Sequence, residues 1–178
     1  MELDKKTLRK KIIKMRLDMN ELDYHRLSHF IINQLKNTQE FQQAHTIAIY
    51  LSYHHEVDTW DLIREIIWTK QLCVPVVKEK HQMDFVELHD LKSLKKNKYG
   101  IGEPKDGKII DKNDIDLIIV PLVAFNNDLY RLGYGGGYYD RYLHDYQGKT
   151  IGLAFSFQKI ENYRPEKHDI PLDIILTE

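Results

Sequence analysis

Glycines are concentrated in one segment, residues 131–140, which reads RLGYGGGYYD. Glycines let backbone N–H groups approach a phosphate closely, and the free amides at the start of a following helix favour an anion. Arg131 adds a planar set of donors suited to phosphate oxygens. The segment therefore predicts a phosphate-binding turn, although its spacing matches neither a Walker A loop nor a GxGxxG turn. The alternative is a tight turn that needs glycine only for left-handed backbone angles.

Further cations lie on an amphipathic helix that we expect over residues 3–19. Residues advance about 100° each around a helix axis, which sorts the side chains of this segment into stripes. One stripe is apolar and contains Leu8, Ile12, Met15 and Met19. The adjoining stripe contains Lys5, Arg9 and Arg16, whereas Lys6, Lys10 and Lys14 point toward solvent. Lys5 and Arg9 could thus reach a cleft beside the buried face; the alternative is a solvated basic helix or a weak nucleic-acid patch.

Two carboxylates and a group of tyrosines are the remaining candidates. Asp140 follows the glycines directly, and a carboxylate next to phosphates needs a cation between them, which makes Asp140 a candidate magnesium ligand. Glu56 follows an apolar run and is preceded by His54 and His55, which we interpret as loop residues because no third metal ligand matches them. Tyrosines and Leu143 recur at helical spacing after the glycines, and most of them indicate a packed helix face. They are Tyr138, Tyr139, Tyr142, Leu143 and Tyr146. Tyr138 and Tyr139 are exceptions by position, because they lie in the first turn beside the glycines and could line a binding pocket.

The elements that must position these residues form an alternating pattern. A second helix is expected over residues 21–36, with Asp23 as a possible cap. Apolar runs of strand length follow at residues 46–51, 72–77, 116–121 and 150–155, and their near-continuous apolarity indicates strands covered on both faces. A helix over residues 59–68 makes a strand-helix-strand crossover between the first two.

The other segments complete the expected fold. Residues 83–88 alternate and suggest an antiparallel strand, residues 171–176 a last strand, and residues 94–114 a long surface loop. We therefore predict one domain over residues 1–178, of class α/β, with three layers (α/β/α) around a mostly parallel, mixed sheet.

Composition limits the function classes. The chain has 178 residues, with 26 lysines and arginines against 27 aspartates and glutamates, so it carries no general field for nucleic acid or an anionic membrane. Cys73 is the only cysteine, which excludes an intrachain disulfide and is typical of a reducing compartment. The sequence shows neither a signal-peptide pattern nor a membrane-spanning apolar run. We expect a cytoplasmic protein without nucleic-acid or membrane partners.

Residues 131–140 resemble the RLGxGxGYYD signature of the 5-formyltetrahydrofolate cyclo-ligases, also called methenyltetrahydrofolate synthetases. Weaker similarities extend over nearly the whole chain: residues 5–9 (KKTLR), residues 49–52 followed by Glu56, Val120 and Pro121 ahead of Ala124 and Phe125, and residues 169–176. The chain departs from the family at Tyr134 and Gly136, where some members carry basic side chains inside the loop. Charge neutralisation would then come from Lys5, Arg9, Arg131 and metal.

The resemblance implies the roles of individual residues. It assigns ATP binding to Lys5, Lys6, Thr7, Leu8, Arg9, Arg131, Leu132, Gly133, Tyr134, Gly135, Gly136, Gly137, Tyr138 and Tyr139. It assigns folate binding to Leu51, Glu56, Tyr134, Gly135, Gly136, Gly137 and Tyr138. Arg131 and Tyr138 are the expected catalytic residues, and Asp140 and Asp173 the expected magnesium ligands; for Asp173 a cap or a surface carboxylate is the alternative.

The implied reaction is an ATP- and Mg²⁺-dependent ligation in folate one-carbon metabolism. The substrate, 5-formyltetrahydrofolate with or without a polyglutamate tail, would be converted to 5,10-methenyltetrahydrofolate with release of ADP and phosphate. Such a site needs glycines, cations and magnesium more than a protein nucleophile. The resemblance also implies a monomer. Two other functions stay open: a binding module without turnover, and a sugar-phosphate isomerase or acyl-CoA transferase, for which the chain shows no motif.

Overall fold

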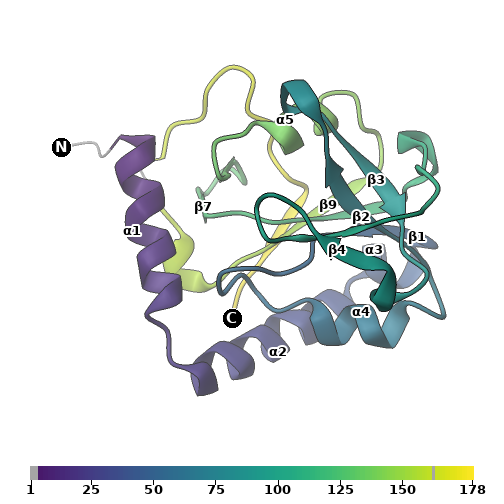
Figure 1. The fold of residues 1–178 in the computed structure, drawn as a ribbon. Helices are drawn as coiled ribbons and strands as arrows, with labels where there is room; N and C mark the ends of the chain where they lie inside the picture. The colour runs from purple at the N-terminus through teal and green to yellow at the C-terminus, as the bar shows by residue number, and fades with distance from the viewer. Residues whose placement is uncertain (1–3, 162) are drawn as a thin grey trace.

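The computed structural model describes residues 4–161 and 163–178, and these form three layers (Figure 1). The central layer is a six-stranded sheet in the order β10-β9-β6-β1-β2-β3. Neighbouring strands are parallel except for β3, which runs antiparallel to β2 at one edge. The strands of this sheet are β1 (Thr46–Ile49), β2 (Gln71–Val77), β3 (Met83–Glu87), β6 (Leu117–Val120), β9 (Lys149–Leu153) and β10 (Ile174–Leu176). The predicted α/β class and the mostly parallel, mixed sheet are confirmed.

Helices cover both faces of the sheet. In Figure 1, α2 and α4 run along the lower face, and α5 lies on the upper face. The α-helices are α1 (Lys5–Leu17), α2 (Glu21–Asn37), α3 (Gln39–Gln43), α4 (Trp60–Ile66) and α5 (Tyr138–Leu143). Short 3₁₀ helices are η1 (Glu79–His81), η2 (Leu91–Ser93), η3 (Lys112–Asp114) and η4 (Ser156–Gln158). None of the helices in the described ranges is long and apolar enough to cross a membrane.

The apolar core consists of three clusters. The largest packs α2 and α4 against one face of the sheet and includes Ile31, Leu35 and Ile63. The second lies under α5 and includes Phe85 and Leu143. The third is small and separate, and joins α1 to the region after β6: Leu8, Ile12, Val123, Ala124, Leu132 and Tyr163. Apolar strands with both faces covered explain the continuous apolar runs of the sequence.

Caps fix where the first two helices begin. Asp4 accepts hydrogen bonds from the backbone N–H groups of Lys6 and Thr7, which places the start of α1 at Lys5. Leu3, the first residue of the predicted helix, lies outside the described residues. The predicted cap of α2 was wrong: Asn20 is the N-cap, and it accepts from the backbone of Asp23, which lies in the first turn.

Two small hairpins were not expected from the sequence. Residues 94–114, predicted as a surface loop, contain β4 (Leu94–Lys96) and β5 (Gly102–Pro104), which pair antiparallel. The second hairpin pairs β7 (Ala124–Phe125) with β8 (Arg131–Leu132), directly after the sheet strand β6. Because β8 leads into the glycines, this hairpin determines where the glycine segment lies relative to the sheet.

Candidate active site

The glycine-rich loop (residues 133–137) connects β8 to α5 beyond the carboxyl end of β6. Gly135 and Gly137 have φ angles of 100° and 69°, in the left-handed region that disfavours side chains. Gly137 is the N-cap of α5, and a Cβ there would lie 2.6 Å from Nη1 of Arg141. The turn therefore needs glycine for its backbone angles at these positions, and phosphate binding by the loop stays a prediction.

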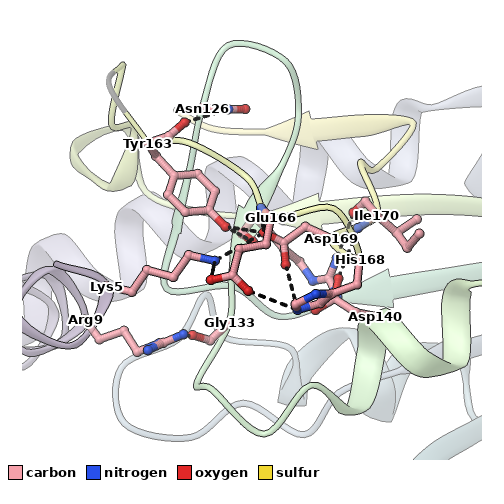
Figure 2. Close-up of polar contacts among 11 residues, drawn as sticks. Lys5, Arg9, Asn126, Gly133, Asp140, Tyr163, Glu166, His168, Asp169 and Ile170 are labelled. Atoms are coloured by element: carbon pink, nitrogen blue, oxygen red, sulfur yellow. Dashed lines mark hydrogen bonds and ion pairs between the residues drawn. The ribbon is translucent and has the colours of Figure 1, made fainter.

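The α1 helix brings two predicted cations to this loop (Figure 2). Nε of Arg9 donates to the carbonyl oxygen of Gly133 at 2.7 Å, and its guanidinium passes beside Gly135. Nζ of Lys5 lies 2.8 Å from Glu166 and 3.4 Å from Asp169. The helical stripe predicted from the sequence thus faces the loop, and Lys5 joins it to the segment before β10.

The other α1 residues assigned to ATP have different surroundings. The side chain and backbone of Thr7 and the backbone of Lys6 are bonded to Asp4, in the exposed first turn. Leu8 is buried in the small third cluster. Of the predicted KKTLR segment, Lys5 and Arg9 are therefore the two residues whose side chains lie against the loop and its neighbours.

Arg131 is held in a buried pair beneath the loop. Its side chain is 3% exposed; Nη1 donates to the Ile170 carbonyl at 3.0 Å and Nη2 to Oδ1 of Asp140 at 3.1 Å. The backbone N–H of Ile170 also donates to Oδ1 of Asp140, at 3.2 Å. Arg131 therefore fixes the first turn of α5 and the segment before β10 relative to β8.

The two aspartates predicted to bind metal have different hydrogen-bond partners. Within residues 4–161 and 163–178, the bonds to Asp140 fall on Oδ1, which leaves Oδ2 available. Such a carboxylate fits Mg²⁺, which takes one or two carboxylate oxygens together with substrate phosphates. Oδ2 of Asp173 instead accepts from the backbone and hydroxyl of Thr150, at the amino end of β9. The described residues contain no group of three or more His, Cys, Asp or Glu side chains arranged for a metal, and the role of Asp173 stays a prediction.

Glu56 reaches the loop through Tyr134. Glu56 is 8% exposed; its Oε1 accepts the Tyr134 hydroxyl at 2.6 Å, and its Oε2 accepts the Tyr53 backbone N–H at 2.9 Å. Burial raises the pKa of Glu56, and the bond from Tyr134 and the charge of Arg16 oppose that rise. Tyr134 as a whole is 50% exposed, but its hydroxyl end is inserted between Glu56 and Arg16. A residue of the glycine-rich loop and the predicted folate carboxylate are thus in direct contact.

The tyrosines after the glycines divide into two kinds. The ring of Tyr138 lies 5.6 Å from that of His81, and the neighbouring Tyr99 hydroxyl raises the pKa of Tyr138. Tyr139 packs edge-on against Phe85, and within the described residues its buried hydroxyl has no hydrogen-bond partner. Burial, followed by the nearby charge of Glu56, raises the pKa of Tyr139. A buried hydroxyl left open close to a carboxylate suits a polar ligand group.

Other predicted residues frame the site. Leu51 is buried in the main core, and its Cδ1 would lie 3.3 Å from a Cβ at Gly102 of the β4–β5 hairpin. His54 and His55 form a turn, as predicted, with φ angles of 48° and 52°. Beside α5 there is an open hollow of about 570 Å³. It is lined by Lys112, Gly137, Asp140, Arg141, His144, Asp145 and His168.

Two site residues had no assigned role in the sequence analysis. Arg16 was placed on the cationic stripe, but nothing indicated that it would be fully buried while Met15, on the apolar stripe, is exposed. Tyr99 lies in the segment predicted as a loop and reaches Tyr138 only because β4 and β5 pair. Helical geometry placed Arg16 on the same side as Lys5 and Arg9, but it did not reveal the burial of Arg16, and no sequence signal pointed to Tyr99.

Comparisons with known proteins agree on one family. The sequence model of the 5-formyltetrahydrofolate cyclo-ligase family matches residues 2–178. The 5-formyltetrahydrofolate cyclo-ligase of Haemophilus influenzae is 35% identical, with 96% of this chain and 95% of the relative covered. That of Escherichia coli K12 is 36% identical, over 75% of this chain and 78% of the relative. The solved structure of the Aquifex aeolicus 5,10-methenyltetrahydrofolate synthetase is similar with a TM-score of 0.87 and 38% identity, covering 97% of this chain and 89% of that one.

Proposed function

Since this chain belongs to the 5-formyltetrahydrofolate cyclo-ligase family, we propose that it converts 5-formyltetrahydrofolate to 5,10-methenyltetrahydrofolate and uses ATP and Mg²⁺ to do so. The observation that carries the proposal is the contact of Tyr134 with Glu56. It brings the glycine-rich loop, suited to phosphates, next to a buried carboxylate suited to a heterocycle. Two substrates that must react with each other need subsites that meet in this way.

The nucleotide end of the site is the glycine-rich loop with its cations. Backbone amides of residues 133–137 and the side chains of Lys5 and Arg9 would bind the phosphates, with Tyr138 and Tyr139 beside them. Arg131 would contribute its charge from beneath the loop, where it also holds Asp140. When bound, magnesium supplies charge neutralisation between phosphate oxygens, and Oδ2 of Asp140 is the protein oxygen that would hold it.

The folate end is built around Glu56. Its carboxylate would accept hydrogen bonds from the pterin ring, whose polar edge carries N–H donors. Leu51 would supply apolar contact, and Tyr138, with its partner Tyr99, would border the rest of the molecule. The unpartnered hydroxyl of Tyr139 supports a polar ligand group beside it, because a buried donor without a partner is costly.

The chemistry follows from the substrates. The formyl oxygen is a poor leaving group, so it first takes the γ-phosphoryl group of ATP, which releases ADP. N10 then attacks the activated formyl carbon and gives up its proton, the C–O bond breaks, and phosphate leaves as the ring closes. The protein positions the two molecules and stabilises charge, with Tyr138 beside the reacting groups and Arg131 acting from beneath the loop.

One assay tests the proposal. Purified protein is incubated with 5-formyltetrahydrofolate, ATP and Mg²⁺, and the methenyl chromophore is followed together with ADP. We expect one ADP per methenyl product, and no product when ATP is left out or the metal is chelated. Equal chromophore without ATP would refute the mechanism, and binding of both ligands without any product would identify a binding module. We also propose that the protein acts as a cytoplasmic monomer, which sedimentation analysis and cell fractionation would test.

A further inference from the structure

Arg16 is a charged side chain with no access to solvent. It is 0% exposed and lies in the last turn of α1. Nη2 donates to the hydroxyl oxygen of Tyr134 at 2.7 Å, and Nη1 donates to the Leu122 carbonyl at 3.3 Å. An isolated buried guanidinium is strongly unfavourable, so a nearby negative group has to compensate for its charge.

That negative group is Glu56, and Tyr134 lies between the two. The Tyr134 hydroxyl accepts from Arg16 and donates to Glu56 at 2.6 Å, which forms a chain of three side chains from three distant segments. The backbone of Arg16 adds a second connection, because its carbonyl accepts Nδ1–H of His55, the residue before Glu56, at 3.0 Å. Arg16 therefore contacts both the glycine-rich loop and the turn that carries the carboxylate.

Other ionisable side chains near Glu56 also interact with its carboxylate and with Arg16. Tyr24 on α2, Tyr50 after β1 and Tyr139 on α5 all sense the carboxylate, which adds to the effect of burial in raising their pKa values. The charge of Arg16 opposes this rise for both Tyr24 and Tyr50. Arg16 is the cation whose charge opposes the rise in the pKa of Glu56, whereas Tyr24, Tyr50 and Tyr139 are phenols that burial keeps neutral.

We propose that Arg16, acting through the Tyr134 hydroxyl, is a positioning residue that couples the folate subsite at Glu56 to the nucleotide subsite at the glycine-rich loop. The inference rests on the proposed function and adds a residue and a role to it. A nucleotide that orders the loop holds Tyr134 against Glu56, and the carboxylate is then fixed in position for the folate. A folate held by Glu56 fixes Tyr134 and, with it, the loop. By linkage, each ligand must then raise the affinity for the other by the same factor.

Equilibrium binding without turnover measures this coupling. The dissociation constant of 5-formyltetrahydrofolate is determined with and without saturating Mg²⁺ and β,γ-imido-ATP, an ATP analogue that does not transfer its phosphoryl group. For the wild-type protein we expect the analogue to tighten folate binding by roughly tenfold, the scale of one hydrogen bond to a charged group. In Tyr134→Phe and in Arg16→Met, the analogue should tighten folate binding by only about twofold or less.

A double-variant cycle separates a linked unit from two independent defects. The variant with both changes should lose no more of the coupling than either single change, because each removes the same connection. Tyr142→Phe is the matched control: it lies on α5 against Phe85, at 4.9 Å between ring centroids, and should keep the wild-type factor. If Arg16→Met does not fold, Tyr134→Phe still tests the inference. Tyr134 is half exposed, so removing its hydroxyl should leave the fold intact.

The outcomes are distinguishable. The inference is overturned if Tyr134→Phe binds both ligands and the analogue tightens its folate binding as much as in the wild type. It is also overturned if the analogue leaves folate binding to the wild-type protein unchanged. Either result leaves the proposed reaction standing if the wild-type protein forms product. A wild-type protein that binds no folate would overturn both.

Discussion

The buried pair of Arg131 and Asp140 gives a quantitative expectation for the change Arg131→Met. The side chains are 3% and 21% exposed, so both charges are largely removed from water. Methionine fills much of the same volume, but it leaves the Asp140 carboxylate and the Ile170 carbonyl without their donor. Removing one partner of a buried pair costs about 3–5 kcal/mol, and the remaining hydration of Asp140 favours the lower end, about 3 kcal/mol. For a chain of this size, this corresponds to a fall in Tm of roughly 6–12 °C.

Thermal and urea denaturation of the wild type, Arg131→Met, Asp140→Asn and the double variant would measure this cost. The double variant should be at least as stable as Arg131→Met, because it no longer contains an unpaired buried charge. A loss of less than about 1 kcal/mol of unfolding free energy in Arg131→Met would show that Arg131 does not hold the loop in place. The bonds of Arg131 to Asp140 and Ile170 would then be ones that bound phosphate readily replaces. A loss of ATP use at full stability would lead to the same conclusion.

The other predictions concern the two carboxylates. Glu56→Gln should weaken 5-formyltetrahydrofolate binding by about 1.5–3 kcal/mol in equilibrium titrations, with the KM for ATP unchanged; an altered metal requirement would contradict this. Asp140→Asn should raise the Mg²⁺ concentration needed for half-maximal turnover while folate binding survives, and unchanged metal titrations would exclude Asp140 as a ligand. Because burial raises the pKa of Glu56 above its usual 4.5, folate affinity should fall as the pH is lowered through that raised value, and Glu56→Gln should lack this acidic limb.

The sheet was predictable because its strands are buried on both faces and form continuous apolar runs in the sequence. The runs at residues 46–51 and 116–121 lie around β1 and β6, which are central and fully buried. The cationic stripe of α1 was predictable for a similar reason, since helical geometry alone places Lys5 and Arg9 on one side. The glycine-rich loop was predictable because four glycines lie within residues 133–137.

What the sequence did not reveal depends on contacts between distant segments. The β4–β5 hairpin has three-residue strands in a polar stretch, too short for a periodic pattern. Nothing local indicates that Arg131 pairs with Asp140, or that Arg16 is buried against Tyr134, because the partners meet only after β7 and β8 fold back. A polar residue gives the same signal whether it is solvated or held in a buried network.

The separate apolar cluster that attaches α1 to the rest of the fold has a consequence for local unfolding. Segments open with free energies that depend on their own contacts, and α1 is held by a few apolar side chains and by polar bonds from Arg9, Lys5 and Arg16. We therefore expect the amide hydrogens of α1 to exchange with solvent before those of the central strands. A nucleotide held by Lys5 and Arg9 would slow that exchange, so filling the site would add to the local stability of the N-terminal helix.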